Sequence, residues 1–317
     1  MLQKDFCNTV VILTALALFA GVVKPAHGET PPSSSTGSTM RGLPGVVIEP
    51  SRLMRAKGYP WAHEIRIALP RSYGEKDRRF PVLWVMDGNY WFETAVRIAN
   101  TYGFKYLPQM IVVGVGVPPD AESEYQMRRT FDFNPNNVVG FEGYGGDLVK
   151  PPPGVPVFKG GGAAAFLTFL VDDVRKALAR DYQTSGEGVL FGDSGGGTFC
   201  TYALLERPAA FQKYICGSPA LYMGNFGLFK LEEAYHRAHS DLAAEVFFGA
   251  GEGEVTEKGT AAAGIVSSMT RMAEILTERS YPSLQLHVRI SPGQEHLSAI
   301  PDNLYWGLRS VMRKPPE

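Results

Sequence analysis

The chain has 317 residues, of which 44% are hydrophobic and 20% are charged, and this composition excludes wholesale disorder. Its 31 Lys and Arg residues nearly balance 32 Asp and Glu residues, which argues against a general nucleic-acid-binding protein. Three cysteines and six histidines, without a Cys-x-x-Cys pair or a His cluster, exclude a disulfide-stapled scaffold and predict neither a metal site nor a cofactor.

The first residues have the pattern of an export signal. Lys4 precedes an apolar run from Val10 to Val23, and Ala26-His27-Gly28 forms a small-x-small cleavage site. The run has about 14 residues, fewer than the roughly 20 that span a bilayer. We therefore expect a signal peptide over residues 1–28 and a periplasmic or secreted protein with no stable membrane span. A retained anchor is the alternative.

Residues 29–45 are rich in Pro, Ser and Gly, and we expect a flexible linker there. Folded structure should start near Val46, with one domain over residues 46–317.

Short apolar runs then alternate with helix-compatible stretches. The expected strands are Val46–Glu49, Glu64–Leu69, Val82–Met86, Ile111–Val117, Gly188–Phe191, Lys213–Cys216, Glu245–Phe248 and Leu284–Ile290. The expected helices are Trp91–Tyr102, Ala163–Arg180, Gly196–Leu205, Leu231–His239, Gly264–Arg279 and Asn303–Met312. The alternation predicts an α/β fold in which helices flank a mostly parallel central sheet.

One segment interrupts this alternation. Pro118 to Gly162 is rich in Pro and Gly and is expected to be a long loop. It is either functional or an inconsequential surface insertion.

The most informative stretch is Gly192-Asp193-Ser194-Gly195-Gly196. It is a Gly-x-Ser-x-Gly motif between an expected strand and an expected helix, which is the context of a nucleophile elbow. Gly192 and Gly196 would leave room for strained backbone at Ser194. The alternative is a glycine-rich turn with an idle serine.

The same letters also occur in chymotrypsin-like proteases, for which His63 would be the base. The helical stretches on both sides of Ser194 argue against a pair of β-barrels, and the disulfide framework of secreted proteases is missing. An α/β-hydrolase instead places its acid and then its histidine after the serine.

His296 lies in a turn-rich loop after the last expected strand, and it is the preferred base. His236 and His239 lie on an expected surface helix, and His287 lies within a strand.

The acid should follow the strand Glu245–Phe248. Glu254 and Glu252 both do so, and the spacing of Glu254 from Gly251 makes Glu254 the preferred residue. If both carboxylates were solvated, Ser194 and His296 would act as a dyad.

An oxyanion hole needs two N–H donors. Gly195 would supply one, and Gly88 or Asn89, which follow the strand Val82–Met86, would supply the other.

Four segments resemble the putative-esterase family, which includes esterase D relatives and siderophore esterases. Pro81–Asn89 is similar to its PVLYLLDGN run, and Arg129–Pro135 to its R-x-x-D-x-T-P segment. Ser218–Tyr222 matches SPSLWW, and Gln294–Ser298 matches GExHxSV. The match spans residues 65–300. Two positions depart from the family, which usually has His where this chain has Asp193 and Thr where it has Asn134.

This resemblance implies an α/β-hydrolase fold and a secreted or periplasmic serine carboxylic-ester hydrolase. It would act on small esters, including siderophore-type esters, through Ser194, His296 and Glu254. Arg128 and Arg129 would bind an anionic substrate group, or form a solvated pair. A non-catalytic periplasmic ligand-binding protein on a hydrolase scaffold and an acyltransferase are the alternatives. The expected partner is the small-molecule ester, and the oligomeric state is open.

Cys200 and Cys216 fall on adjacent buried elements. They could pair in an oxidising compartment or remain packed thiols.

Overall fold

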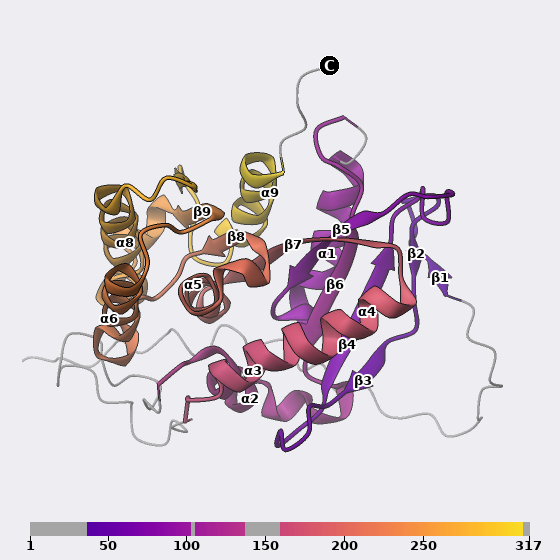
Figure 1. The fold of residues 1–317 in the computed structure, drawn as a ribbon, viewed down its shortest axis with the longest axis horizontal. Coiled ribbons are helices and arrows are strands. Elements are labelled where there is room, and N and C mark those ends of the chain that lie inside the picture. The colour runs from indigo at the N-terminus through magenta and orange to yellow at the C-terminus, as the bar shows by residue number, and fades with distance from the viewer. Residues whose placement is uncertain (1–36, 103–104, 137–158, 313–317) are drawn as a thin grey trace, which may run out of the picture.

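The computed structural model describes residues 37–102, 105–136 and 159–312 (Figure 1). The expected signal peptide and the start of the expected linker lie outside these residues. In the described part, no helix has the length and apolar character needed to cross a membrane.

A ten-stranded sheet forms the centre of the molecule, with path order β1-β2-β4-β6-β5-β7-β8-β9-β10 and β3 paired with β4. The strands are β1 Ser38–Thr39, β2 Val47–Ile48, β3 Arg52–Met54, β4 His63–Leu69, β5 Phe80–Val85, β6 Ile111–Gly116, β7 Thr184–Asp193, β8 Gln212–Gly217, β9 Ala244–Gly251 and β10 Leu284–Ser291. From β6 to β10 all neighbours are parallel, whereas β1 to β4 pair in antiparallel fashion. The carboxyl ends of β5 to β10 therefore share one edge of the sheet.

Helices cover both faces of this sheet (Figure 1). The longer helical elements are α1 Gly88–Tyr102, α2 Tyr125–Phe133, α3 Ala163–Thr168, α4 Arg175–Asp181, α5 Gly195–Glu206, α6 Met223–Ala238, α7 Lys258–Ala262, α8 Ile265–Arg279 and α9 Ala299–Val311. The short ones are η1 Pro119–Glu124, η3 Pro208–Ala210 and η4 Glu252–Val255, and η2 Phe169–Val174 is a π-helical turn.

Two apolar cores lie against the two faces, because successive strand residues point to opposite sides. One core joins α1 and α9 to residues such as Leu83 and Phe191. The other joins α3, α4, α5, α6 and α8 to residues such as Trp84 and Leu190. Strands buried on both faces read as continuous apolar runs, which is why the sequence predicted them. The expected α/β fold with a mostly parallel sheet is confirmed.

Several elements differ from expectation; for example, α6 begins at Met223 rather than at Leu231. The folded part begins before Val46, because β1 adds to the sheet through backbone hydrogen bonds that need no apolar side chain. The Pro118–Gly162 segment contains η1 and α2 rather than only loop. Pro118 and Pro119 occur there at a helix start, where proline is well tolerated.

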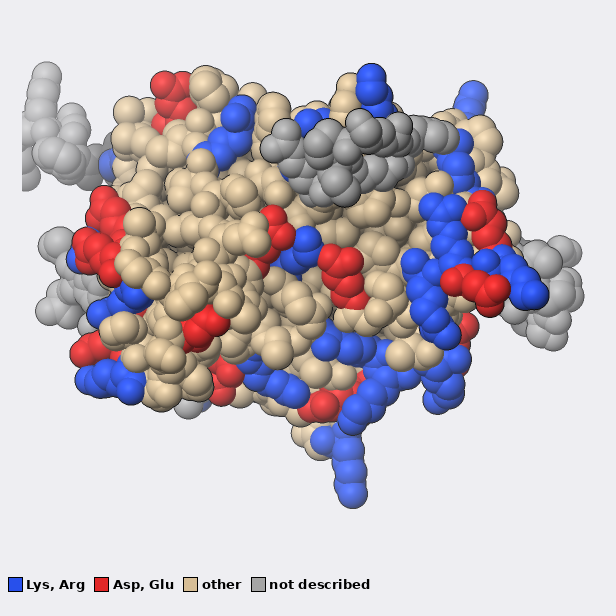
Figure 2. All heavy atoms as spheres, turned by 45° about the horizontal axis from the view of Figure 1, so that its top comes forward, with Lys and Arg blue, Asp and Glu red and all other residues tan. Residues whose placement is uncertain are grey.

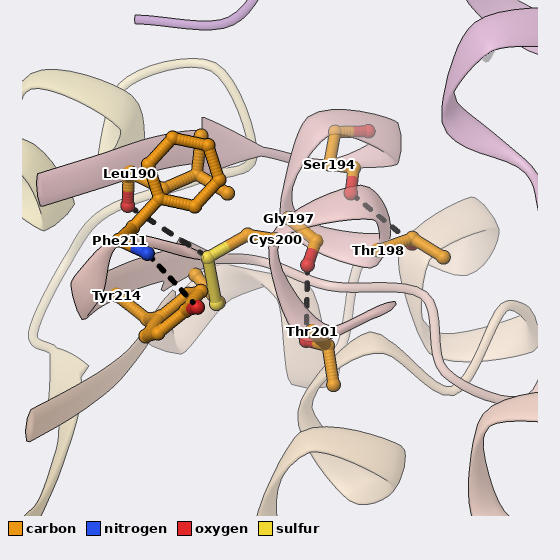
Figure 3. The surroundings of a disulfide bond; sticks show 9 residues. Leu190, Ser194, Gly197, Thr198, Cys200, Thr201, Phe211 and Tyr214 are labelled. Atoms are coloured by element: carbon orange, nitrogen blue, oxygen red, sulfur yellow. Dashed lines mark hydrogen bonds between the residues drawn. A yellow bond between two sulfur atoms is a disulfide. The ribbon is translucent and has the colours of Figure 1, made fainter. Parts of the chain in front are cut away.

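A disulfide between Cys200 and Cys216 ties α5 to β8. The bridge extends from Cys200 on α5, with Leu190, Phe211 and Tyr214 around it (Figure 3). Both sulfur-bearing residues are fully buried. Of the two alternatives that the sequence left open, the structure has the paired one.

Acidic and basic side chains are mixed over a largely uncharged surface on the face that Figure 2 presents. This mixture matches the near-zero net charge of the sequence.

Candidate active site

Ser194 occupies a strained turn between β7 and α5. Its backbone has φ +57° and ψ −121°, a conformation that non-glycine residues adopt only where the surroundings enforce it. A Cβ on Gly192 would lie 2.1 Å from the carbonyl oxygen of Gly196, and one on Gly197 would lie 2.1 Å from that of Gly217. The turn therefore has the strained strand-to-helix geometry that a nucleophile elbow requires.

The positions of the turn that leave no room for a side chain differ in part from those expected. A Cβ on Gly196 would have ordinary contacts, its nearest neighbour being Asp87 Oδ2 at 3.4 Å. The crowding falls on Gly192 and Gly197 instead, because the backbone of the elbow folds onto itself and onto β8.

Two helix N-termini meet beside Ser194. Gly195 begins α5, and Gly88 begins α1 directly after β5, the strand that pairs with β7. Within the described residues, the N–H groups of Gly195, Gly88 and Asn89 have no hydrogen-bond acceptor. Such free N–H groups at helix starts favour a developing negative charge.

Glu254 and His296 lie together at the same edge of the sheet. Glu254 follows β9, His296 follows β10, and the imidazole Nδ1 is 3.1 Å from Glu254 Oε1. The Glu254 side chain is completely buried, and the His296 side chain is 20% exposed. A carboxylate in this position holds the Nδ1–H tautomer, which leaves Nε2 as the basic nitrogen.

Glu252 does not take this place. Its Oε2 accepts a hydrogen bond from the Gly293 backbone at 2.8 Å, and the residue is exposed. The preference for Glu254 over Glu252 agrees with this geometry.

The pKa of the His296 imidazole is raised above its ordinary value. Burial acts to lower its pKa, but the hydrogen bond that His296 donates to Glu254 and the charges of Asp193 and Glu254 outweigh burial and raise the pKa above 6.5. Asp193, the residue before Ser194, thus acts electrostatically on this imidazole. Ser194 Oγ makes no hydrogen bond with any described residue, which is common in unliganded active sites.

The other histidines lie elsewhere. His239 stacks on Tyr235 at the end of α6, and His287 lies on β10 near Glu245. His63, the base of the chymotrypsin-like alternative, is buried with its Nε2 2.8 Å from Asp132 Oδ2. The observed sheet excludes the paired β-barrels of that alternative.

Arg129 lies on α2 and contacts the turn that holds Ser194. Its Nε and Nη2 donate to the two carboxylate oxygens of Asp87 at 2.8 and 3.0 Å, and Nη2 also approaches the carbonyl oxygen of Asp193 at 3.3 Å. Tyr125 donates to the same Asp87 carboxylate. Burial acts to lower the pKa of Arg129, but Asp87 outweighs it and the pKa is raised, so the guanidinium stays charged.

The sequence predicted only backbone donors in the Asp87-Gly88-Asn89 run. It did not predict that the Asp87 side chain would pair with Arg129. The signal that could have found it is an acid in that run together with the Arg of the R-x-x-D segment. The Asn89 side chain bonds to the backbone of Val117 in both directions, each at 2.7 Å.

Arg128 does not join this cluster. It pairs with Glu124 at 2.8 Å, donates to the carbonyl oxygen of Ala62 and lies over the ring of Trp61. These contacts occupy its guanidinium, and they account for the residue without a substrate.

The family comparison agrees with this arrangement. A family model described as "Putative esterase" matches residues 57–278. The chain belongs to this esterase family. The matched range includes Ser194 and Glu254 and ends before His296.

Two curated proteins are similar to this chain. The ferri-bacillibactin esterase BesA of Bacillus subtilis is 30% identical over 186 residues, covering 57% of this chain and 60% of BesA. The siderophore triacetylfusarinine C esterase of Aspergillus fumigatus is 28% identical over 186 residues, covering 56% and 58%. The chain thus aligns with less than two thirds of the length of each.

Solved structures show the same fold over more of the chain. The BES protein from Bacillus cereus has a TM-score of 0.70 at 24% identity, and the match covers 91% of this chain and 100% of the BES chain. The siderophore hydrolase EstA from Aspergillus nidulans has a TM-score of 0.71 at 20% identity, covering 87% and 97%. The expected α/β-hydrolase fold is confirmed.

Proposed function

We propose that this protein is an exported serine carboxylic-ester hydrolase in which Ser194 is the nucleophile, His296 the general base and Glu254 the orienting acid. The observation that carries the proposal is the Glu254–His296 hydrogen bond, which lies at the same sheet edge as the strained turn of Ser194. Ser, acid and His follow one another in the order that α/β-hydrolases use.

The proposed reaction has two halves. Nε2 of His296 takes the proton of Ser194 Oγ as the oxygen attacks the ester carbonyl. The N–H groups of Gly195 and of Gly88 or Asn89 stabilise the oxyanion. Collapse expels the alcohol, which receives the proton from His296. A water molecule activated by His296 then releases the acid and restores Ser194.

The substrate class is proposed from the relatives. BesA and the triacetylfusarinine C esterase are named for siderophore esters, and we propose that this chain takes esters of that kind. Arg129 supports an anionic or carbonyl-rich acyl part, because its Nη1 has no acceptor among the described residues and lies beside Gly195. We do not extend this role to Arg128, whose donors are engaged elsewhere.

Export is supported by two features. The first residues carry the pattern of a signal peptide, and a buried disulfide is typical of proteins in oxidising compartments.

A substrate panel tests the proposal. The purified protein and Ser194→Ala would be assayed against p-nitrophenyl acetate, feruloyl and acetyl sugar esters, and ferric triscatecholate and hydroxamate siderophore esters. We expect Ser194-dependent hydrolysis, with the highest kcat/KM on a siderophore ester. Equal rates for the two proteins would refute the serine mechanism, and a preference for another ester would refute the substrate class.

A further inference from the structure

A run of hydrogen bonds connects the residue before the nucleophile to the imidazole of His296. Asp193 Oδ2 accepts from Asn303 Nδ2 at 2.9 Å, and the same amide nitrogen lies 3.4 Å from Ser218 Oγ. The Ser218 hydroxyl donates to Glu254 Oε1 at 2.8 Å, and that oxygen is the partner of His296 Nδ1. The run therefore joins the last residue of β7 and the segments that follow β8, β9 and β10 to α9.

This run lies inside the protein. Asp193 is 4% exposed, and Asn303, Ser218 and Glu254 are not exposed at all. Hydrogen bonds in such surroundings polarise one another, and an unpaired polar atom there is costly. Even so, Asp193 Oδ1, Asn303 Oδ1 and Glu254 Oε2 have no partner among the described residues.

Glycines keep the space for the polar pair. A Cβ on Gly217 would lie 2.0 Å from Asp193 Oδ2, and a Cβ on Gly249 would lie 2.4 Å from Asn303 Oδ1. Apolar packing at such a position is often at least as stable as buried polar groups. A buried carboxylate with one unpartnered oxygen at this position therefore points to a role other than packing.

The hydrogen bonds of the run have a fixed donor and acceptor order. This order requires a group at its first position, Asp193, that can only accept. An asparagine amide has a donor end and an acceptor end, whereas an ionised carboxylate only accepts. Facing Asp193, the amide of Asn303 must present its N–H group, which also points at Ser218 Oγ. The single hydroxyl proton of Ser218 is then free to point at Glu254, and Glu254 in turn accepts from His296 Nδ1.

We propose that Asp193 is a positioning residue that sets, through Asn303 and Ser218, the orientation of Glu254 and the tautomer of His296. This inference rests on the proposed function and deepens it. With Nδ1–H held by Glu254, Nε2 is the nitrogen left to accept the proton of Ser194. Partners of this kind commonly fix the tautomer and orientation of a reacting imidazole.

Other charges face the two ends of the run. Arg129 from α2 contacts the backbone carbonyl of Asp193, and His296 itself feels Glu257 in addition to Glu254 and Asp193. Burial raises the pKa of Asp193 to about 7, against the lowering effects of His296, Asn303 and Arg129. Because a protonated carboxyl can donate as well as accept, Asp193 imposes the orientation of Asn303 only while it is ionised, at pH values above this pKa.

A double-mutant cycle tests the inference. Asp193→Asn keeps the shape but offers a second amide, which no longer dictates the orientation of Asn303. We expect Asp193→Asn to lower kcat by about tenfold or more with little change in KM, and the same change in a Ser218→Ala background to have an effect within about twofold. Equal fold-losses in both backgrounds would overturn the inference, because a through-space effect of charge does not need Ser218.

The matched control is Glu252→Gln, which removes a carboxylate from η4 outside the run. It is expected to keep the parent kcat, and a loss like that of Asp193→Asn would contradict the specific role of the run. If Asp193→Asn does not fold, Asn303→Leu interrupts the same run and is expected to reproduce the fall in kcat at unchanged KM.

A spectroscopic readout separates this inference from the proposed function. The ¹⁵N shifts of the His296 ring, measured above its pKa in the Ser194→Ala background, report the tautomer without any turnover. We expect the Nδ1–H tautomer with Asp193 present and a mixture after Asp193→Asn. An unchanged tautomer would overturn the inference even if the hydrolase function holds.

Discussion

Glu254 Oε1 lies 3.1 Å from His296 Nδ1, so the turns after two neighbouring parallel strands are joined at the carboxyl edge of the sheet. Carboxyl edges of such sheets are where α/β proteins gather residues from different loops. Through this contact an acid and a base 42 positions apart in the sequence come together. Replacing Glu254 tests whether this contact matters for activity.

Loss of the Glu254 carboxylate should be far more damaging than loss of its neighbour. We expect Glu254→Gln to reduce kcat by at least about 100-fold, because an amide can leave the imidazole in the wrong tautomer. Glu252→Gln should keep nearly the full rate, since Glu252 is exposed and binds only the Gly293 backbone. Steady-state kinetics with a p-nitrophenyl ester measure both, and similar losses for the two variants would contradict the assignment of the acid.

Activity should be lost with decreasing pH, and the midpoint of this loss should lie above the ordinary pKa of histidine. His296 must be neutral to accept a proton, and Glu254 and Asp193 raise its pKa above 6.5 despite burial. The kcat/KM profile should therefore lose activity as pH falls through this raised value. Asp193→Asn should move that limb to lower pH, because a neutral amide no longer stabilises the imidazolium. A limb centred below 6.5 in the parent protein would argue against this electrostatic arrangement.

The Arg129–Asp87 pair should stabilise the elbow as a unit. Removing one partner of a largely buried ion pair leaves the other charge uncompensated, so Arg129→Met should cost about 3 kcal/mol of unfolding free energy. Adding Asp87→Asn should recover about 1 kcal/mol or more of that loss. Arg128→Met is the matched control, and its loss should be smaller, since Glu124 is 48% exposed. Urea unfolding would be measured for the parent, Arg129→Met, Asp87→Asn, the double variant and Arg128→Met, and strictly additive losses in the Arg129–Asp87 cycle would contradict the coupling.

The disulfide should matter for stability more than for chemistry. It closes a short loop, with Cys200 and Cys216 separated by 16 positions, and bridges of that size contribute about 3 kcal/mol. Cys200→Ser with Cys216→Ser should lower the urea midpoint, and the reductant dithiothreitol should lower the midpoint of the parent but not of the variant. If dithiothreitol left the urea midpoint of the parent protein unchanged, this result would contradict a structural role for the bridge.

The sequence predicted those parts of the fold and site that depend on local chemistry. The Gly192-to-Gly196 motif requires a tight turn wherever it sits, and the buried strands read as apolar runs because both of their faces are covered. Glu254 was chosen over Glu252 by its spacing from Gly251 alone. These inferences used neighbours in the chain, and the observed geometry agrees with them.

The parts that escaped prediction depend on contacts between distant segments. Nothing near Asp87 indicates that Arg129 will reach it, and Ser218 and Asn303 gain their places only when β8, β9 and α9 are assembled. Helix α2 was hidden by the Pro- and Gly-rich residues around it, although its own residues are compatible with a helix. Arg128 and Arg129 look alike in sequence, and only the direction of each side chain from α2 separates them.

Covalent labelling tests the central claim most directly, because it asks whether the hydroxyl of Ser194 is activated by His296. The parent protein, Ser194→Ala and His296→Asn would be treated with a fluorophosphonate, and the adduct located by peptide mass spectrometry. The account predicts one adduct per parent chain on Ser194, none on Ser194→Ala, and labelling of His296→Asn slowed by at least about 100-fold. An unlabelled Ser194 in the parent, as in a binding protein without catalysis, or equally fast labelling without His296, would contradict it.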